Sequence, residues 1–190
     1  MKTPIPTLLL AATLFIASGG VSAVSAYRLV WEARQQIGRT TSYDPAYTPL
    51  PYPMGDVPVG KGVCTDVVIR SLRRQGVDLQ RLIHEDMVKD FAAYPKKWGL
   101  SRPDPNIDHR RVPNIATYFQ RRGYQVSDGR YLAGDIVTWD LGRGLTHIGI
   151  VSDRRAKNGT PLILHNIGNG TREEDILRRY TVTGHYRLPH

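Results

Sequence analysis

Apolar residues recur at intervals of three and four positions through the first two thirds of the chain, and they form short continuous runs after residue 134. The first pattern is typical of amphipathic helices. A glycine follows three of the segments, near the point where a helix commonly ends. Five prolines interrupt the period over residues 40–62, which are predicted to form an extended loop. The predicted helices cover residues 27–37, 64–74, 79–91 and 112–122.

The β-rich runs in the last third read "DIVTWDL", "HIGIVSD", "PLILHNI" and "TVTGHYRL". Turn-like stretches between them suit hairpins, so neighbouring strands are expected to pair antiparallel. Helices therefore come first and an antiparallel meander follows. This order predicts the α+β class, with a helix layer packed on one small antiparallel sheet.

The first 26 residues run from one cation, Lys2, through a short apolar stretch to small residues. That order is typical of a secretory signal peptide, and the apolar stretch is too short for a membrane span. We expect cleavage after Ala23 or Ala26 and a periplasmic product without stable membrane insertion. The rest divides into a leading helix with the proline-rich loop, residues 27–62, and a main domain, residues 63–190.

The charge balance is basic, with 26 lysines and arginines against 17 acidic residues, a net charge of +9 and a pI near 9.9. Such a balance favours polyanionic partners. Because export separates the protein from nucleic acid, the expected polyanions are anionic lipid head groups or the acidic polymers of a bacterial envelope. Charge that is simply dispersed over a solvated surface is the alternative.

The chain has a single cysteine, Cys64, within "GVCTDVVIRS". One cysteine cannot form a disulfide within the chain. It stands in the first turn of a predicted helix, where unpaired backbone N–H groups and the helix dipole favour a thiolate. The sequence therefore predicts a reactive thiol; a buried small apolar side chain is the alternative.

Two histidines are placed to assist that thiol. His147 begins one predicted strand and His165 ends the next, 18 residues later. In antiparallel neighbours such positions can lie side by side, so one imidazole can orient the other. We expect Cys64 to be the nucleophile, His147 the general base and His165 the orienting group. A register shift by one residue would put Asn166 in the place of His165.

These motifs resemble those of a known family. "GVCTDVVIRS", "GDIVTWDLGRGLTHIGIVSD" and "ILHNIG" are similar to segments of the NlpC-type cell-wall cysteine peptidases of the papain-like superfamily. With "HEDM", "PDPNIDHRRVPN" and "GHYR", the chain also resembles an exported bacterial family catalogued as domain of unknown function 1287. The resemblance implies a papain-like fold and cleavage of peptidoglycan stem peptides. No ligand spacing of the zinc type occurs, so we expect no metal and no cofactor.

The resemblance extends to a tyrosine and has three departures, one of which is the unusually long interval of 83 residues between Cys64 and His147. Tyr52 lies 12 residues before Cys64, where a tyrosine borders the active site in several NlpC-type enzymes. Val63 replaces the aspartate that the family commonly has before the nucleophile. Asp66 replaces a small residue, and its carboxylate is expected to oppose thiolate formation.

A second polar segment holds Asp108, His109 and Arg110. They are expected to support the substrate cleft, where arginine would grip the carboxylates of an acidic peptide. The alternative is a proline-fixed loop held by its own salt bridges. Two other functions stay open for the whole chain: a non-catalytic envelope-binding module, and a thiol acyltransferase on the same scaffold.

Overall fold

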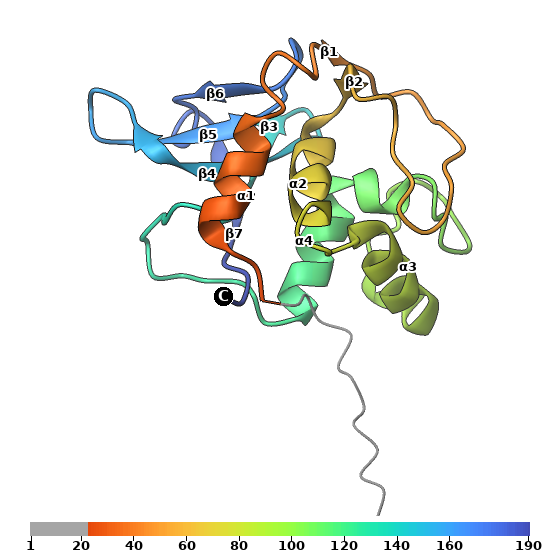
Figure 1. The fold of residues 1–190 in the computed structure, drawn as a ribbon. Helices are drawn as coiled ribbons and strands as arrows, with labels where there is room; N and C mark the ends of the chain where they lie inside the picture. The colour runs from red at the N-terminus through yellow and green to blue at the C-terminus, as the bar shows by residue number, and fades with distance from the viewer. Residues whose placement is uncertain (1–22) are drawn as a thin grey trace, which may run out of the picture.

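The computed structural model describes residues 23–190. The predicted signal peptide lies almost wholly in residues 1–22, outside the described residues. Four α-helices and a five-stranded antiparallel sheet confirm the α+β prediction (Figure 1). All but the first helix begin at the residue that the apolar period predicts. The helices are α1 (Ala26–Arg34), α2 (Cys64–Arg73), α3 (Leu79–Lys89) and α4 (Val112–Arg121).

The large sheet has the strand order β6-β5-β4-β3-β7, with every neighbour antiparallel. Its first three strands in sequence, β3 to β5, form the predicted meander, and β6, which was not predicted, extends it. The last strand departs from that pattern, because it returns to pair with β3 at the far edge. The strands are β3 (Ile136–Gly142), β4 (Leu145–Arg155), β5 (Pro161–His165), β6 (Arg172–Glu174) and β7 (Thr181–Tyr186).

The proline-rich loop is not wholly irregular, which corrects the sequence prediction. Two-residue strands β1 (Ser42–Tyr43) and β2 (Lys61–Gly62) pair in parallel and close the loop. Two short 3₁₀ helices, η1 (Phe91–Ala93) and η2 (Asp108–Arg110), lie between α3 and α4. These elements are too short to carry an apolar period, so the pattern could not reveal them.

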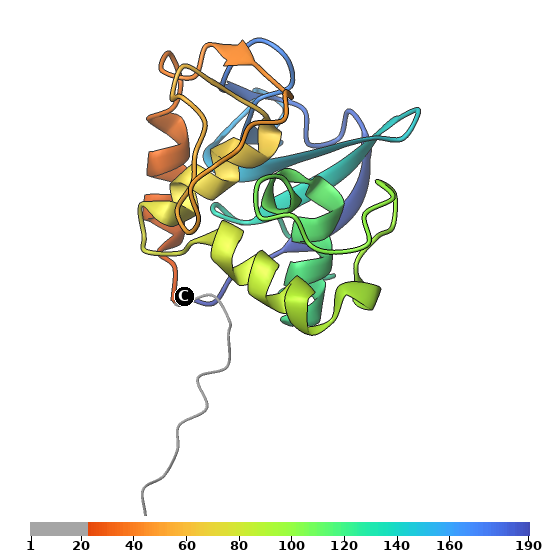
Figure 2. The same cartoon turned by 90° about the vertical axis from the view of Figure 1, so that its right-hand side faces the viewer.

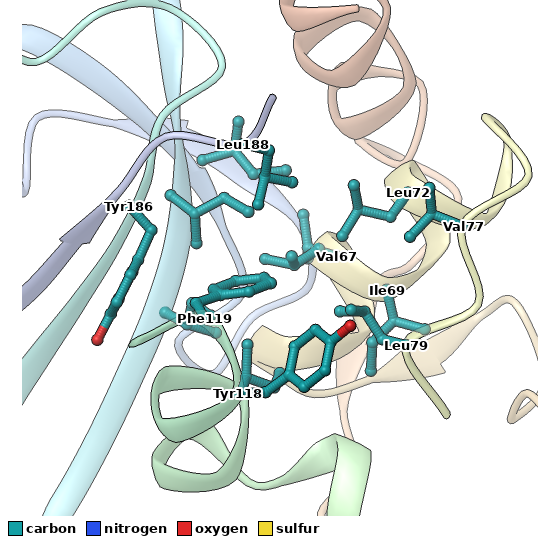
Figure 3. Close-up of a cluster of buried hydrophobic side chains, with 14 of the residues drawn as sticks. Val67, Ile69, Leu72, Val77, Leu79, Tyr118, Phe119, Tyr186 and Leu188 are labelled. Carbon is teal, nitrogen blue, oxygen red and sulfur yellow. The ribbon is translucent and has the colours of Figure 1, made fainter. Parts of the chain in front are cut away.

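The helices bury their apolar faces against one side of the sheet. Val67 and Leu72 of α2 point toward Phe119 of α4, whose ring lies 5.5 Å from that of Tyr186 in β7 (Figure 3). Leu29 of α1 belongs to the same core, so the leading helix packs with the rest of the chain. The turned view shows α3 and α4 side by side (Figure 2).

Alternate strand residues face opposite sides of the sheet. Ile148 and Ile150 of β4 join the core under the helices. A smaller cluster on the other side includes Trp139 and Val151, together with Leu177 from the segment after β6. No helix within residues 23–190 is long and apolar enough to cross a membrane.

Candidate functional site

Cys64 is the first residue of α2 and opens on a cavity of about 400 Å³. The sulfur-bearing residue is only 4 % exposed. Residues from four separate segments line the cavity, namely Tyr43 and Pro45; Val63 and Cys64; Lys97, Trp98, Ile107 and Arg110 to Pro113; and Gly144 to Thr146. The cysteine therefore lies at the wall of a cavity large enough for several ligand atoms.

Asp66 stabilises the start of α2. Its Oδ2 accepts a hydrogen bond of 2.7 Å from the backbone N–H of Val63, a donor that the helix itself cannot satisfy. Both carboxylate oxygens also accept from the Arg110 guanidinium, at 3.0 and 2.9 Å. Both side chains are almost fully buried. Asp66 thus has a structural role, and the Arg110 guanidinium places a compensating charge beside the carboxylate that the sequence led us to expect to oppose thiolate formation.

The two histidines lie on neighbouring strands and contact each other. Nε2 of His147 is 3.0 Å from Nδ1 of His165, with the ring planes nearly perpendicular. Nε2 of His165 is in turn 3.1 Å from Oε2 of Glu174 in β6. Both rings are buried. The structure therefore joins His165, not Asn166, to His147.

The sulfur meets β4 one residue beyond His147. The backbone N–H of Ile148 is directed at the sulfur. The described β4–β5 register stops at Ile150, so β5 does not pair with Ile148. The side chains of His147 and Trp139 lie on the same face of the sheet, the one that points away from the helices. Within residues 23–190 no hydrogen bond joins the Cys64 sulfur to the imidazole of His147, and catalytic contacts of this kind often tighten only when substrate binds.

The expected thiolate is not the resting form. Burial raises the pKa of the Cys64 thiol to about 12, and the nearby Asp66 charge adds to the rise. The N–H groups of Ile148, Thr65 and Cys64 itself act in the opposite direction but are outweighed. The helix start thus lowers the thiol pKa as expected, but burial raises it by more. The prediction of a resting thiolate is therefore wrong for this state, because sequence position did not reveal the burial.

Burial also keeps the imidazoles neutral. It lowers the pKa of His147 to about 3, together with a smaller contribution from the neighbouring His165. The pKa of His165 falls to about 4 for the same reason, although the Glu174 carboxylate opposes the fall. At neutral pH the site thus holds a neutral thiol and two neutral rings.

Asn166 has a different position from the one considered in the sequence. Its amide nitrogen donates to the carbonyl oxygen of Gly62 at 3.0 Å and, more weakly, to that of Ser42. The side chain is fully buried. It ties the end of β5 to the segment just before Cys64, and so holds the cysteine and histidine segments together.

Tyr52 lies away from the cavity. It is 44 % exposed, and its ring meets the edge of His84 on α3 at 5.1 Å. The tyrosine in the cavity lining is instead Tyr43 of β1. Burial raises the pKa of Tyr43 to about 12, with a further contribution from Cys64. Sequence spacing could not identify Tyr43, because β1 is only two residues long.

The segment around Asp108 is held by its own bonds. Asp108 accepts hydrogen bonds from the Asp104 backbone and from Arg111. His109 is buried outside the cavity lining, and burial lowers its pKa to about 4. Arg110 lines the cavity but is bound to Asp66. These residues are therefore better described as a loop held by its own salt bridges than as free groups that bind substrate carboxylates.

Two further cationic groups lie at the cavity, and one of them, Arg111, belongs to the same polar segment and is itself paired with Asp108 at 2.9 Å. Arg111 lines the cavity and stacks on Trp98, with its guanidinium carbon 4.1 Å from the ring centre. Lys97 is exposed at the same rim. The sequence analysis did not single out Lys97 or Glu174. The pair "EE" at residues 173–174 points to a carboxylate near His165 only once the strand register is known.

Comparisons with known proteins add a family but no activity. No solved structure matches the chain. The chain is 61 % identical over 159 residues to the uncharacterized protein YijF of Escherichia coli strain K12, covering 82 % of this chain and 78 % of that protein. The model of the family described as a domain of unknown function, DUF1287, matches residues 30–188. The chain belongs to the DUF1287 family.

Proposed function

We propose that the protein is an exported thiol-dependent hydrolase that cleaves an amide bond in peptidoglycan stem peptides. Cys64 would be the nucleophile, His147 the general base and His165 the orienting group. One observation carries the proposal: a cysteine at a helix start opens on a cavity, beside the strand that bears a histidine bonded to a second histidine. Nucleophile, base and orienting group in that order are the parts of a thiol hydrolase.

The reaction begins from neutral groups. The Cys64 proton passes to His147 as the sulfur attacks the substrate carbonyl carbon, so the ring must approach the sulfur when substrate binds. His147 then gives the proton to the leaving amine as the carbon–nitrogen bond breaks. Water releases the acyl group from sulfur by the reverse sequence of proton transfers. The backbone N–H groups near the sulfur would hold the oxyanion.

The cavity favours an acidic, peptide-sized substrate. Lys97 and Arg111 place positive charge at its rim, while Tyr43 and Trp98 offer aromatic surface. A guanidinium pairs well with a carboxylate. The stem peptides of peptidoglycan, which the NlpC-type resemblance implies as substrates, carry carboxylates.

We further propose that the fold is of the papain-like, NlpC type. The support is the order of elements. A helix bearing Cys64 precedes an antiparallel sheet, the base lies on one strand, and the third polar residue lies on the next.

Export would cut the chain after Ala23 and not after Ala26. Val24 is 1 % exposed, and its backbone N–H donates to the Pro189 carbonyl oxygen at 2.8 Å. Ser25 caps α1 by accepting from the Arg28 backbone. Cleavage after Ala26 would remove both. The intact mass of the protein recovered from the periplasm should correspond to residues 24–190; a mass for 27–190 contradicts this site.

The function is tested by incubating purified murein with the wild-type protein and with Cys64→Ala, then separating the soluble fragments. New peptide fragments should form only with the wild type. Cys64→Ser serves as the matched control for shape, because it retains a hydrogen-bonding group but is a far weaker nucleophile. Identical fragment patterns for all three proteins would overturn the proposal.

The buried thiol with its raised pKa favours one second function, an envelope-binding module without catalysis. It requires murein binding that weakens with salt and survives Cys64→Ala. It also requires that iodoacetamide labels Cys64 no faster than free cysteine at pH 7. Faster labelling of the wild type than of His147→Gln would exclude this alternative.

A further inference from the structure

Glu174 is a carboxylate at the end of the histidine pair that the triad does not use. The β5–β6 register sets Glu174 opposite Ile163, and therefore on the same face as His165, two residues farther along β5. Its Oε2 lies 3.1 Å from Nε2 of His165. That distance suits a hydrogen bond, although the ring N–H points off the line to the oxygen in this conformation. The Glu174 side chain is 39 % exposed and has room to align.

The neutral histidine pair has two proton arrangements. In the first, His147 Nε2–H donates to His165 Nδ1, which leaves a lone pair on His147 Nδ1 and a proton on His165 Nε2. In the second, His165 Nδ1–H donates to His147 Nε2, which puts the remaining proton of His147 on Nδ1. Only the first arrangement leaves His147 Nδ1 able to accept a proton from a thiol.

We propose that Glu174 is a positioning residue that selects the first arrangement. A carboxylate accepts hydrogen bonds and cannot donate them, so it favours a proton on the His165 nitrogen that faces it. The second arrangement would turn a lone pair toward the negative charge. The chain Glu174–His165–His147 thereby fixes which nitrogen of His147 is the base. This role rests on the proposed function, since it supposes that His147 deprotonates Cys64.

Neighbouring charges do not replace Glu174. Arg172 stands directly opposite His165 in the strand pair and donates to the Asn169 carbonyl oxygen. A guanidinium donor at His165 Nε2 would favour the second arrangement. Glu173 is on the other face and binds Arg34 and Ser152.

The test reads the proton positions directly. Protein labelled with ¹⁵N-histidine is studied at neutral pH by two-bond ¹H–¹⁵N spectra, which separate protonated from lone-pair ring nitrogens, with signals assigned through His147→Gln and His165→Gln. The wild type should carry protons on Nε2 of both rings. Glu174→Ala should move proton density onto His147 Nδ1, whereas Glu174→Gln should restore the wild-type pattern, because the amide oxygen still accepts.

The second readout is the alkylation rate of Cys64 at pH 7, which should fall about tenfold in Glu174→Ala. Asp175→Asn is the matched control, since it removes a neighbouring exposed carboxylate that does not contact His165. A wild-type spectrum with a proton on His147 Nδ1, or a Glu174→Ala spectrum identical to wild type, would overturn the proposal. Neither spectrum depends on murein cleavage, so failure of the hydrolase proposal is a separate outcome.

Discussion

Two histidines of the same sheet are buried to a similar degree but have opposite kinds of partner. His185 on β7 donates from Nε2 to Asp135 at 2.6 Å and stacks on Tyr131, with ring centres 4.5 Å apart. His147 on β4 instead contacts a second neutral ring. A carboxylate holds an imidazole firmly in one role. A second imidazole leaves room for a proton to move, which is the property that distinguishes the candidate base from a structural histidine.

The largest expected effect comes from making the same substitution at both histidines. His147→Gln should lower murein cleavage about a thousandfold, because it removes the general base. His185→Gln should keep the wild-type rate per folded molecule and lower the denaturation midpoint. Rates are compared after the folded fraction is measured by circular dichroism. Equal loss of activity in the two variants would contradict the assignment of His147.

Replacing Asp135, the carboxylate partner of His185, should affect stability alone. Asp135 is 1 % exposed and also accepts from both Nε and an NH2 group of Arg187. Burial acts to raise its pKa, but these hydrogen bonds hold the pKa below the ordinary value. Asp135→Asn should therefore lower the free energy of unfolding by about 3 kcal/mol, measured by urea titration at pH 7. An unchanged midpoint would show that this network contributes little.

The pH dependence of stability gives a smaller, graded effect. Burial depresses the pKa of His147 and His165 to about 3 and about 4, so between those values and 6.5 the unfolded chain binds more protons than the folded one. The free energy of unfolding should consequently fall as the pH drops through this window. The slope is at most about 1.4 kcal/mol per pH unit for each histidine. His147→Gln should show a shallower slope between pH 6.5 and 4; an identical slope would contradict a neutral, buried ring.

The helical and strand periods of the sequence were enough to predict most of the fold and the placement of the two histidines on neighbouring strands. With Ile150 opposite Leu164, residues 147 and 165 fall one diagonal step apart on one face, and this spacing was visible in the sequence. Strand β6 was not, because "REE" has no apolar alternation.

What the sequence could not supply was burial and long-range pairing. The helix position of Cys64 suggested a low thiol pKa, but the enclosure that raises it depends on four segments distant in sequence. Asp66 was recognised as a charge near the sulfur, whereas its partner Arg110 is 44 residues away. The sign of a charge can be read from the sequence, whereas the residue that neutralises it becomes known only from the tertiary structure.

The Asn166 tether to Gly62 has a consequence for the order in which the site is assembled. The cysteine is synthesised 83 residues before His147 and 102 residues before Asn166. A chain that has not yet completed β5 lacks both His165, the partner of His147, and the Asn166 tether to the cysteine segment. Under the proposed function, the nascent polypeptide would therefore be inactive until the C-terminal strands have closed.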